Sequence, residues 1–260
     1  MGFLTKTALL IGCVFVIAFL KDPVVNVLAQ IFAGVFGTMV FQAVVDNRHY
    51  LKFLPRLAAI MVQGGKLRIS FAALIRIKLG STYLLVKSDR TGKWQPVGGV
   101  YRFFDKGKIS DLKLKSDIGF SNVDPDEFRL TLSSEHIFNS LKLVDWFESR
   151  LGREISPHRE YQEELVDTGI LTDLRLKSPA LEFTHRERFL SYSKHFRVWE
   201  LKIFEIFELK LSTEQEALLR AAVNGSSDRL VLLDQKAIES SGFVNDTTNY
   251  YLGDHTRYVL

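Results

Sequence analysis

The sequence has little cysteine, little excess charge, and no internal repeat or low-complexity segment. Its one cysteine, Cys13, lies inside an apolar run, which excludes a disulfide framework and a cysteine-based zinc site. The 34 basic and 30 acidic residues are interspersed and leave a net charge of only +4. Proteins that bind nucleic-acid polymers concentrate basic residues on one face, so we expect no such polymer as a partner.

Two common glycine-rich phosphate loops are missing as well. The sequence has no Walker loop, and Gly98-Gly99 is too short to count as a Rossmann signature. What is present is 47% hydrophobic residues in a chain of 260, enough for one core without disulfides or metals, plus an appendage. Apolar residues are concentrated before residue 46 and most of the charge follows it, so the two parts are interpreted separately.

Charge is sparse in two early segments. Residues 23–45 carry none, and residues 3–20 carry only Lys6. At 1.5 Å per residue, a helix over the second segment can cross a hydrocarbon core of about 30 Å. Lys21-Asp22-Pro23 separates the segments and predicts a tight turn, because proline is tolerated in a first helical turn. We predict a transmembrane hairpin over residues 1–45, with helices at about 3–20 and 23–45.

The basic residues around this hairpin predict its orientation. Lys6 precedes it and Arg48, Lys52 and Arg56 follow it, against one lysine in the turn. By the positive-inside rule, both termini face the cytoplasm, and the protein is a multi-pass protein of the cell inner membrane. A cleaved signal peptide is the alternative, although no A-x-A-like cleavage site follows the first apolar segment.

The second hydrophobic segment has a stripe of polar and small residues at every fourth position. Such residues allow close helix approach and hydrogen bonds between helices. The stripe therefore predicts contact with the first helix, or with another subunit in a homo-oligomer or pore. Its members are Asn26, Gln30, Gly34, Thr38 and Gln42.

After a juxtamembrane connector over residues 46–66, the pattern predicts an α+β domain over residues 67–260. Alternating and β-branched residues predict strands at 67–78, 83–87, 93–103, 180–193, 196–210 and 229–233. Helical periodicity predicts helices at 134–150, 156–166 and 212–223. We expect a loop at 105–126 and an irregular tail from residue 242. Strands and helices in this order favour one mixed sheet.

The most informative segment is Arg159-Glu160-Tyr161-Gln162-Glu163-Glu164. A helix places Glu160, Glu163 and Glu164 on one face, at spacings of three and four residues. Three carboxylates there repel one another unless they are solvated or hold a hard divalent cation. Mg²⁺ prefers such oxygens together with water and phosphate. A solvated surface is the alternative interpretation.

This segment resembles the core of the Nudix box, R-E-U-x-E-E-x-G-U, in which U is apolar. Upstream, Tyr83-Leu84-Leu85-Val86 and Trp94-Gln95-Pro96-Val97-Gly98-Gly99-Val100 resemble the strand and glycine element of the same family. The resemblance implies an α/β/α Nudix-like mixed sheet, with Mg²⁺ as a possible cofactor. It implies Glu160, Glu163 and Glu164 as metal ligands and as the catalytic candidates.

The residues predicted to contact a nucleotide come from both elements and from a basic hairpin. Trp94 could stack on a base or belong to the core. Arginine binds phosphate oxygens bidentately, and the alternative is an ordinary solvated strand position. The predicted nucleotide-binding residues are Trp94, Gly98, Gly99, Arg159, Arg186 and Arg188.

The sequence departs from the Nudix box in two places. About fifty residues separate the glycine element from the arginine-glutamate helix, an insertion at about 105–150. The family's additional glutamate is Phe104 or Leu151 here, depending on the side from which it is counted, and four residues rather than one separate Glu164 from Gly169. These departures leave the metal ligands in place and put efficient hydrolysis in doubt.

A membrane hairpin before a divergent Nudix domain resembles the SMODS-associated Nudix architecture of bacterial CBASS antiphage systems. That resemblance implies a membrane effector. A cyclic nucleotide made by a cGAS-like nucleotidyltransferase binds the Nudix-like domain, and the hairpin oligomerises to disrupt the inner membrane. The alternatives are a membrane-tethered, Mg²⁺-dependent Nudix hydrolase of a nucleoside-diphosphate-linked substrate, and a passive membrane scaffold. Both hypotheses that involve a nucleotide, the sensor and the hydrolase, require the acidic helix to fold back beside Gly98-Gly99.

Overall fold

The computed structural model describes residues 52–260 apart from 118–123, 174, 175, 177, 226, 227, 246 and 247, together with residues 27, 30, 35, 38 and 50. The chain divides into two compact units, Met1–Ala59 and Ile60–Leu260. The predicted transmembrane hairpin lies almost wholly outside the described residues. Among the residues that are described, no helix combines the length and the apolar character that a membrane span needs.

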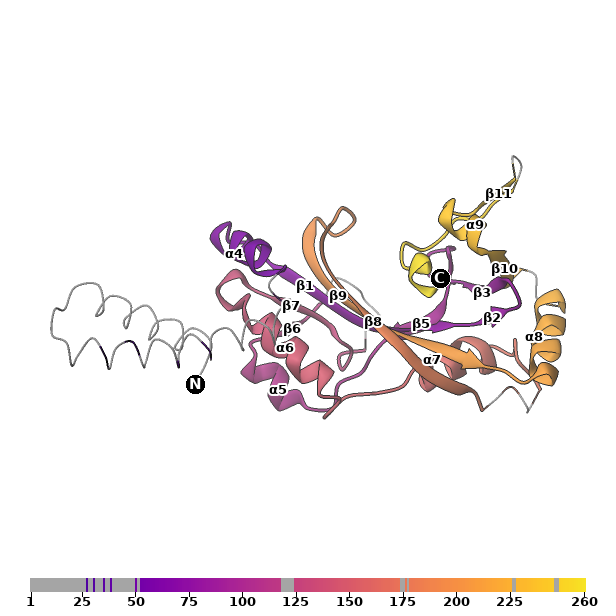
Figure 1. Ribbon diagram of the computed structural model, residues 1–260, viewed down its shortest axis with the longest axis horizontal. Coiled ribbons are helices and arrows are strands. Elements are labelled where there is room, and N and C mark those ends of the chain that lie inside the picture. The colour runs from indigo at the N-terminus through magenta and orange to yellow at the C-terminus, as the bar shows by residue number, and fades with distance from the viewer. Residues whose placement is uncertain are drawn as a thin grey trace. The chain divides into compact units, whose positions relative to one another are not determined.

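The main sheet of the second unit is built around strand β1 (Leu67–Arg76). Nearly every residue of β1 is buried, as expected for a central strand covered on both faces. The order is β6-β7-β1-β9-β8, and β5 also pairs with β1 (Figure 1). The other strands are β5 (Val97–Val100), β6 (Lys115–Ser116), β7 (Arg129–Leu132), β8 (Ala180–Ser193) and β9 (Val198–Lys210).

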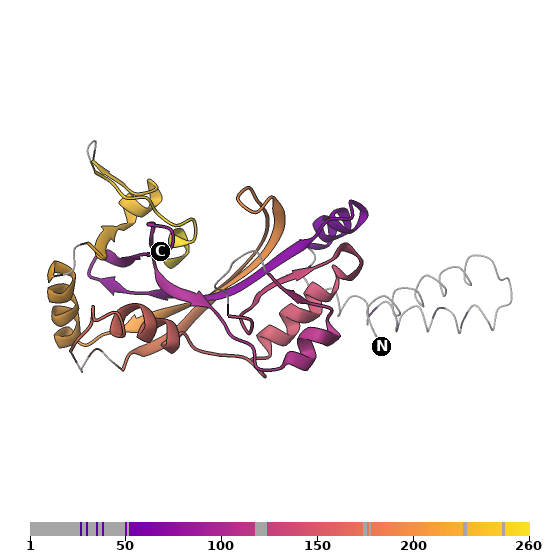
Figure 2. The same cartoon turned by 180° about the vertical axis from the view of Figure 1, so that it is seen from behind.

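Strand β1 has two halves with different neighbours on one edge. Its first half, from Leu67 to Ser70, pairs antiparallel with β7, and its second half, from Ala72 to Ile75, pairs antiparallel with β5. The long strand β9 runs parallel to both halves on the other edge. Figures 1 and 2 show α5 (Lys106–Asp111) and α6 (Asn139–Glu148) beside the β7 half. The insertion therefore extends the main sheet.

The expectation of one mixed sheet is wrong, because the strands divide between two larger sheets and a small hairpin. The second sheet has the order β10-β3-β2, with β4 on β3. The chain leaves the main sheet at Ile77 and turns back at Gly80, where φ is +62°. The strands are β2 (Lys78–Leu79), β3 (Thr82–Lys87), β4 (Trp94–Gln95), β10 (Leu230–Asp234), β11 (Phe243–Asn245) and β12 (Thr248–Asn249). The α+β fold itself is confirmed.

Three stretches expected to lack regular structure contain helices. Helix α5 lies in the segment expected to be a loop, and the Asp105 carboxylate caps it by accepting the Lys108 N–H at 3.0 Å. Helix α4 (Leu54–Val62) lies in the expected connector, and the expected irregular tail contains a 3-10 turn at Thr256–Val259. Helix α9 (Gln235–Glu239) precedes that tail, in a segment for which no element was predicted. The predicted helix at 212–223 is confirmed as α8 (Thr213–Gly225).

The two ends of the insertion are joined. Phe103 forms an antiparallel bridge with Arg153, and the Phe104 N–H donates to the Gly152 carbonyl at 2.8 Å. Between them, the insertion contributes Phe128 and Phe147 to an aromatic core with Phe71 of β1, with ring centroids 4.7–5.6 Å apart. Such pairs prefer tilted and edge-to-face geometry. The insertion therefore begins and ends at neighbouring positions in the structure.

Candidate functional site

The acidic segment forms helix α7 (His158–Tyr161), which continues into a π-helical turn at Gln162–Val166. Tyr161 and Leu165 are buried in the core, and the Tyr161 hydroxyl donates to the Leu176 carbonyl at 2.8 Å. Because Tyr161 and Leu165 fix one side of the helix in the core, the neighbouring side, which carries Glu160 and Glu164, faces β5. The predicted helix at 156–166 is therefore confirmed in place, with its second turn wider than an α-helical turn.

The carboxylates of α7 meet the glycine element at β5. The Gly98 N–H donates to Glu164 Oε2 at 3.0 Å. At Gly99, a Cβ atom would lie 2.1 Å from Glu160 Oε2, so the Glu160 carboxylate occupies the space that a side chain would need. Gly98 has φ +151°, and a Cβ there would lie 2.2 Å from the Ala73 carbonyl oxygen. Gly99 is therefore required for helix α7 to approach this strand, and Gly98 is required for β5 to lie against β1.

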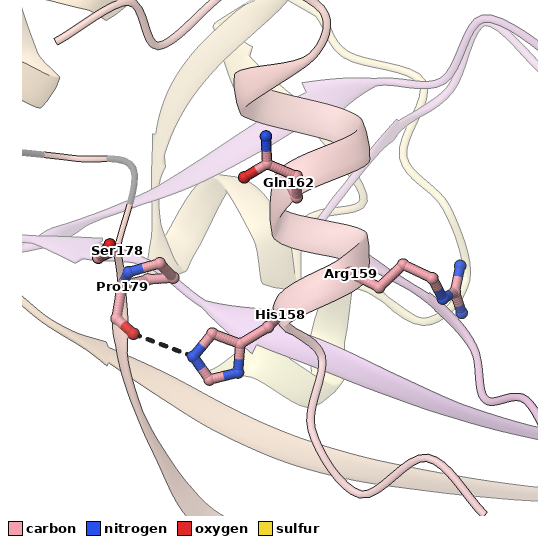
Figure 3. A pocket seen from close by; sticks show the side chains of 5 residues that line it. All are labelled: His158, Arg159, Gln162, Ser178 and Pro179. Carbon is pink, nitrogen blue, oxygen red and sulfur yellow. Dashed lines mark hydrogen bonds between the residues drawn. The ribbon is translucent and has the colours of Figure 1, made fainter. Parts of the chain in front are cut away.

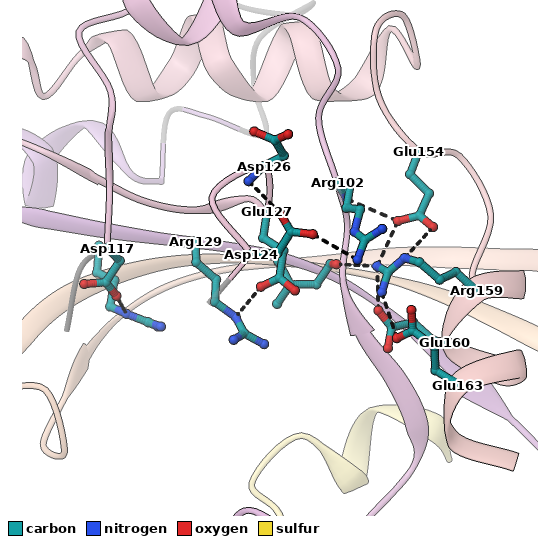
Figure 4. A network of polar contacts seen from close by, with 12 residues as sticks. Arg102, Asp117, Asp124, Asp126, Glu127, Arg129, Glu154, Arg159, Glu160 and Glu163 are labelled. Atoms are coloured by element: carbon teal, nitrogen blue, oxygen red, sulfur yellow. Dashed lines mark hydrogen bonds and ion pairs between the residues drawn. The ribbon is translucent and has the colours of Figure 1, made fainter. Parts of the chain in front are cut away.

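Arg159 holds three carboxylates and the backbone of β5 together (Figure 4). Its guanidinium lies 2.7 Å from Glu160, 3.1 Å from Glu163 and 3.1 Å from Glu154. It also donates to the Val100 carbonyl at 2.9 Å. Glu163 is exposed and turned toward Arg159, whereas Glu160 is buried against the glycine. The arginine thus fixes the carboxylates by a multidentate contact.

Two of these carboxyl groups retain protons near neutral pH. Burial raises the pKa of Glu160 to about 7, and neighbouring carboxylates add to the shift while Arg159 opposes it. Burial also raises the pKa of Glu164 to about 8, with further contributions from Glu160 and Glu163 and opposition from the Gly98 N–H. Crowded, partly desolvated carboxyl groups either hold protons or bind a cation. The two carboxyl groups therefore exchange protons near neutral pH, and a cation bound there would have to displace those protons.

Glu154 makes the contact with Arg159 from the segment that closes the insertion. Its two carboxylate oxygens accept from Arg159, one from Nε and one from Nη2, each at 3.1 Å, and the Arg102 N–H donates to the second at 3.1 Å. The positions where the Nudix box has its additional glutamate point away, since Phe104 is 67% exposed and Leu151 is 71% exposed. Glu154 therefore supplies a carboxylate to Arg159 although it lies outside the box.

We expect Glu154→Gln to lower the stability of the domain. The amide leaves Arg159 with one acceptor fewer and places an NH₂ group near a donor, at a cost of about 2 kcal/mol. For a domain of this size that corresponds to a fall in Tm of roughly 4–8 °C. Thermal unfolding of the full chain measures it. Glu135→Gln, at an exposed carboxylate paired with His136, is the matched control. Equal Tm values for both variants would contradict this role.

A hollow of about 490 Å³ borders the outer side of α7 (Figure 3). Its lining comes from the helix and from the chain that precedes β8. The His158 imidazole reaches across it and hydrogen-bonds the Pro179 carbonyl at 3.2 Å. Arg159 lines this hollow and also contacts the carboxylates. The lining residues are His158, Arg159, Gln162, Ser178 and Pro179.

The other predicted nucleotide contacts lie apart from the glycine turn. Trp94 is half-buried on β4 and packs edge-to-face on Tyr250, at 5.8 Å between centroids. Arg186 pairs with Glu205 and Glu148, and Arg188 pairs with Glu148. In the strand register, Arg186 lies three strands across from Gly99. The structure therefore brings Gly98, Gly99 and Arg159 together and leaves Trp94, Arg186 and Arg188 in other contacts.

Comparison with known families identifies this arrangement. The family model described as the SMODS-associated NUDIX domain matches residues 66–260. The chain belongs to this family. The SMODS-associated Nudix domain thus covers the glycine turn, α7 and the whole insertion, and membership places the chain among Nudix-like domains of CBASS-type antiviral proteins.

Neither curated proteins nor solved structures extend this assignment. No curated protein matches the chain. A solved structure titled "Crystal structure of UDP-X diphosphatase" matches with 11% sequence identity, over 85% of this chain and 93% of that chain, at a TM-score of 0.19. A TM-score this low supports no inference about substrate or mechanism.

Nudix domains commonly use Mg²⁺. Of the three predicted ligands in this SMODS-associated Nudix domain, only two lie at the glycine turn. Glu160 and Glu164 converge on the glycine turn, whereas Glu163 is turned to Arg159. Within the described ranges, no three acidic, histidine or cysteine side chains are arranged to hold a metal ion. The donor chemistry suits a hard cation, and completing the set requires Glu163 to leave Arg159.

Sequence reasoning missed three residues at this site. Glu154 contacts Arg159 directly, and Glu127 and Arg129, both within the insertion, lie within electrostatic reach of the Arg159–Glu160 pair. None has a periodic or motif signal, because their positions depend on how the insertion folds. The only available sign was the polar segment Arg153-Glu154 directly before the Nudix helix.

Proposed function

We propose that this SMODS-associated Nudix domain is a nucleotide sensor that binds a phosphorylated ligand at the junction of α7 and the glycine turn. The observation that carries the proposal is the contact of Glu160 and Glu164 with Gly99 and Gly98. Two carboxyl groups that hold protons in the free protein can instead bind a divalent cation, which attracts phosphate. When the two carboxylates turn to the cation, the Gly98 N–H and the space beside Gly99 would become open to that phosphate.

Mg²⁺ is the cation that best fits the donor set. Glu160 and Glu164 would hold it, with Glu163 joining once it separates from Arg159. The guanidinium then becomes available to a phosphate oxygen, to which arginine binds bidentately. Arg159 both contacts Glu163 and lines the hollow beside α7, which supports this exchange. Metal and nucleotide would therefore bind cooperatively.

The proposed ligand is a cyclic nucleotide made by a cGAS-like nucleotidyltransferase, and the proposed outcome is disruption of the inner membrane. In this proposal residues 1–45 form a transmembrane hairpin with both termini in the cytoplasm, and ligand binding drives homo-oligomerisation. A ligand can shift this equilibrium only if it binds the assembled state more tightly. The family's association with CBASS-type systems supports the ligand class.

Titration calorimetry with full-length protein in detergent tests the binding step. We expect at least one member of a panel of cyclic di- and trinucleotides to bind in the presence of Mg²⁺. Glu164→Gln should weaken that affinity about tenfold or more, since a charge-assisted contact contributes about 1.5–3 kcal/mol. Glu216→Gln, at a partly exposed carboxylate of α8 paired with Arg220, is the control and should bind normally. Absence of binding by the whole panel would remove the sensor proposal.

Crosslinking in membranes tests the second step separately. We expect larger assemblies in the presence of the bound nucleotide and Mg²⁺ than without them. A strictly monomeric chain in both conditions would rule out ligand-driven assembly while leaving nucleotide binding in place.

A hydrolase is the second candidate, and the raised pKa of Glu160 favours it. A carboxylate with a pKa of about 7 is suited to accept a proton from water at neutral pH. Bound Mg²⁺ would polarise the phosphate and activate water. In this case Mg²⁺-dependent release of a nucleoside monophosphate should disappear in Glu163→Gln and Glu164→Gln. Binding without any turnover over hours would exclude this candidate.

A further inference from the structure

One end of the main sheet lies where the chain enters the second compact unit. This unit begins at Ile60, and its first strand, β1, begins at Leu67. Strand β9 starts at the same level, since Leu67 pairs with Trp199. The turn between β8 and β9 therefore extends past the start of β1, and Figures 1 and 2 show this hairpin projecting from the sheet. We call residues 60–67 and 191–199, together with the start of β6, the entry end.

Strand β6 starts at the entry end for a reason of strand direction. Lys115, its first residue, pairs with Thr131 of β7, and Thr131 pairs with Arg68 of β1. Both pairings are antiparallel, so β6 and β1 run in the same direction and start at the same level. Three parts of the chain that are distant in the sequence therefore meet at this end.

Four basic residues of the entry end have no partner in the part of the chain that the structure describes. One precedes β1, one opens β6, and two lie in the turn between β8 and β9. All four are exposed, and none makes an ion pair or a ring contact with a described residue. These residues are Lys66, Lys115, Lys194 and Arg197.

The carboxylates close to these cations along the chain do not neutralise them. Asp117 and Glu200 are both paired with Arg68. Asp111 and Glu135 are exposed, and they supply two negative charges against four positive ones. The entry end therefore carries excess positive charge on an exposed surface, which attracts a partner with many negative charges.

Aromatic and apolar side chains accompany the cations. Tyr192 is 51% exposed and packs edge-to-face on Trp199, with ring centroids 5.9 Å apart. Val62, the last residue of α4, is 82% exposed. Tyrosine and tryptophan combine an apolar ring with a polar group, and both are enriched where a bilayer meets water. The entry end therefore combines positive charge with side chains suited to an interface.

A bilayer with anionic headgroups fits this combination better than a soluble anion does. A soluble anion would neutralise the cations but would leave Val62 and Tyr192 in water. Basic clusters next to a membrane-spanning segment bind anionic lipids, with a gain of roughly fivefold for each lysine or arginine. The chain before Ile60 contains the proposed transmembrane hairpin, so the entry end is the part of the second unit that follows this hairpin most directly.

We propose that the entry end docks on the anionic surface of a membrane, with its four cations on lipid headgroups and Tyr192 at the bilayer interface. This proposal rests on the membrane location in the proposed function and is independent of the ligand. The docked surface excludes the carboxylates of α7 and the glycine turn.

Docking at this end leaves the nucleotide site accessible. Gly99 pairs with Ala73, which lies six residues beyond Leu67 on β1. At roughly 3.3 Å per residue, the glycine turn is about 20 Å along the strand from the entry end. A nucleotide can therefore reach the glycine turn while the domain is docked.

Quenching of a reporter by lipid tests the proposal in the full-length chain. Cys13, the one cysteine of the sequence, is replaced by alanine, and a fluorophore is attached through Ser191→Cys close to the β8–β9 turn. Ala217→Cys is the matched control, on α8, which follows the far end of β9. The vesicles are phosphatidylcholine with one quarter phosphatidylglycerol and a quencher on a lipid headgroup. Quenching at residue 191 should be at least about twofold stronger than at residue 217.

Charge variants show whether the cations cause the docking. Lys66→Gln, Lys115→Gln and Lys194→Gln together should lower the ratio of docked to free domain by roughly 100-fold, which brings quenching at residue 191 to the control level. Vesicles of phosphatidylcholine alone, or about 0.5 M NaCl, should have the same effect. A control variant with the same loss of charge should leave the quenching unchanged. It carries glutamine at three exposed lysines elsewhere, Lys78, Lys210 and Lys236.

Three outcomes would overturn the proposal. They are equal quenching at residues 191 and 217, unaltered quenching in the variant that lacks the three entry-end lysines, and equal quenching with and without phosphatidylglycerol. Alkaline carbonate extraction tests the transmembrane hairpin separately. A chain that washes off the vesicles would overturn the hairpin, and the same quenching assay, with vesicles added to the purified chain, would still decide whether the entry end docks.

Discussion

Gly99→Ala should lower the affinity for nucleotide by at least about 100-fold and should destabilise the domain. The added methyl group would lie 2.1 Å from Glu160 Oε2, so the Glu160 carboxylate must leave its position. Glu160 is also bound to Arg159, so the displacement extends to the other carboxylates. Overpacking of this kind costs roughly 1–3 kcal/mol, and the site loses its geometry in addition. Calorimetry and thermal unfolding of the full chain measure the two effects.

Gly225→Ala is the matched control for this substitution. Gly225 is the last residue of α8, and a Cβ there would have no neighbour within 4 Å. This variant should bind nucleotide and unfold as the unaltered chain does. Combining Gly99→Ala with Glu160→Ala should recover much of the lost stability without recovering binding, because the steric conflict disappears together with the carboxylate. Normal binding by Gly99→Ala would show that Glu160 need not occupy this position.

Between pH 6.5 and pH 8.5 the metal-free chain should lose stability as the pH rises. The folded pKa values of Glu160 and Glu164 are raised to about 7 and about 8 from an ordinary value of 4.5. Within this window the folded protein retains protons that the unfolded chain has released, so raising the pH favours unfolding. The stabilisation is complete below about pH 4.5 and is lost as the pH rises through the two folded values. The expected change is on the order of 2–3 kcal/mol, or roughly 5–10 °C in Tm.

Thermal unfolding across this pH range, with and without Mg²⁺, measures the effect. In the proposed function Mg²⁺ binds the deprotonated carboxylates, and on that proposal its addition should reduce the loss at pH 8.5. Glu164→Gln should flatten the pH dependence, whereas Glu216→Gln, at a partly exposed position of α8, should preserve it. Below pH 6.5 the lowered pKa of buried His255, about 4, has the opposite sign, which is why the window begins there. A flat profile for the unaltered chain would show that these carboxyl groups are not protonated when folded.

The sequence predicted those parts of the fold whose residues follow a strong pattern over several turns or strand positions. The apolar run of β1, the long strands β8 and β9 and the capped helix α8 were all located correctly. Helix α5 was missed because it has six residues, no buried position and a cap as its main signal. Two sheets instead of one also could not be foreseen, since the division depends on a bend after Ile77.

The site was predictable where it depends on motif order and not where it depends on the insertion. The order of the glycine element and the acidic helix predicted that Gly98, Gly99 and Glu160 lie together, and the structure places them so. Glu154 and Arg129 were missed because the folded insertion brings them to Arg159 and to Ser70. The expected placement of Arg186 near phosphate did not anticipate its pairing with Glu205 and Glu148.

The parallel pairing of β1 with β9 has a consequence for the order of events during biosynthesis. The ion pair between Arg68 and Glu200 joins positions 132 residues apart, and β1 has no parallel neighbour until β9 has been made. At roughly 5–20 residues per second, a ribosome needs on the order of ten seconds to cover that distance. Contacts between such distant residues also form slowly. The central pair of strands is therefore completed late, so a newly made chain should reach its folded state only when translation of the domain is nearly finished.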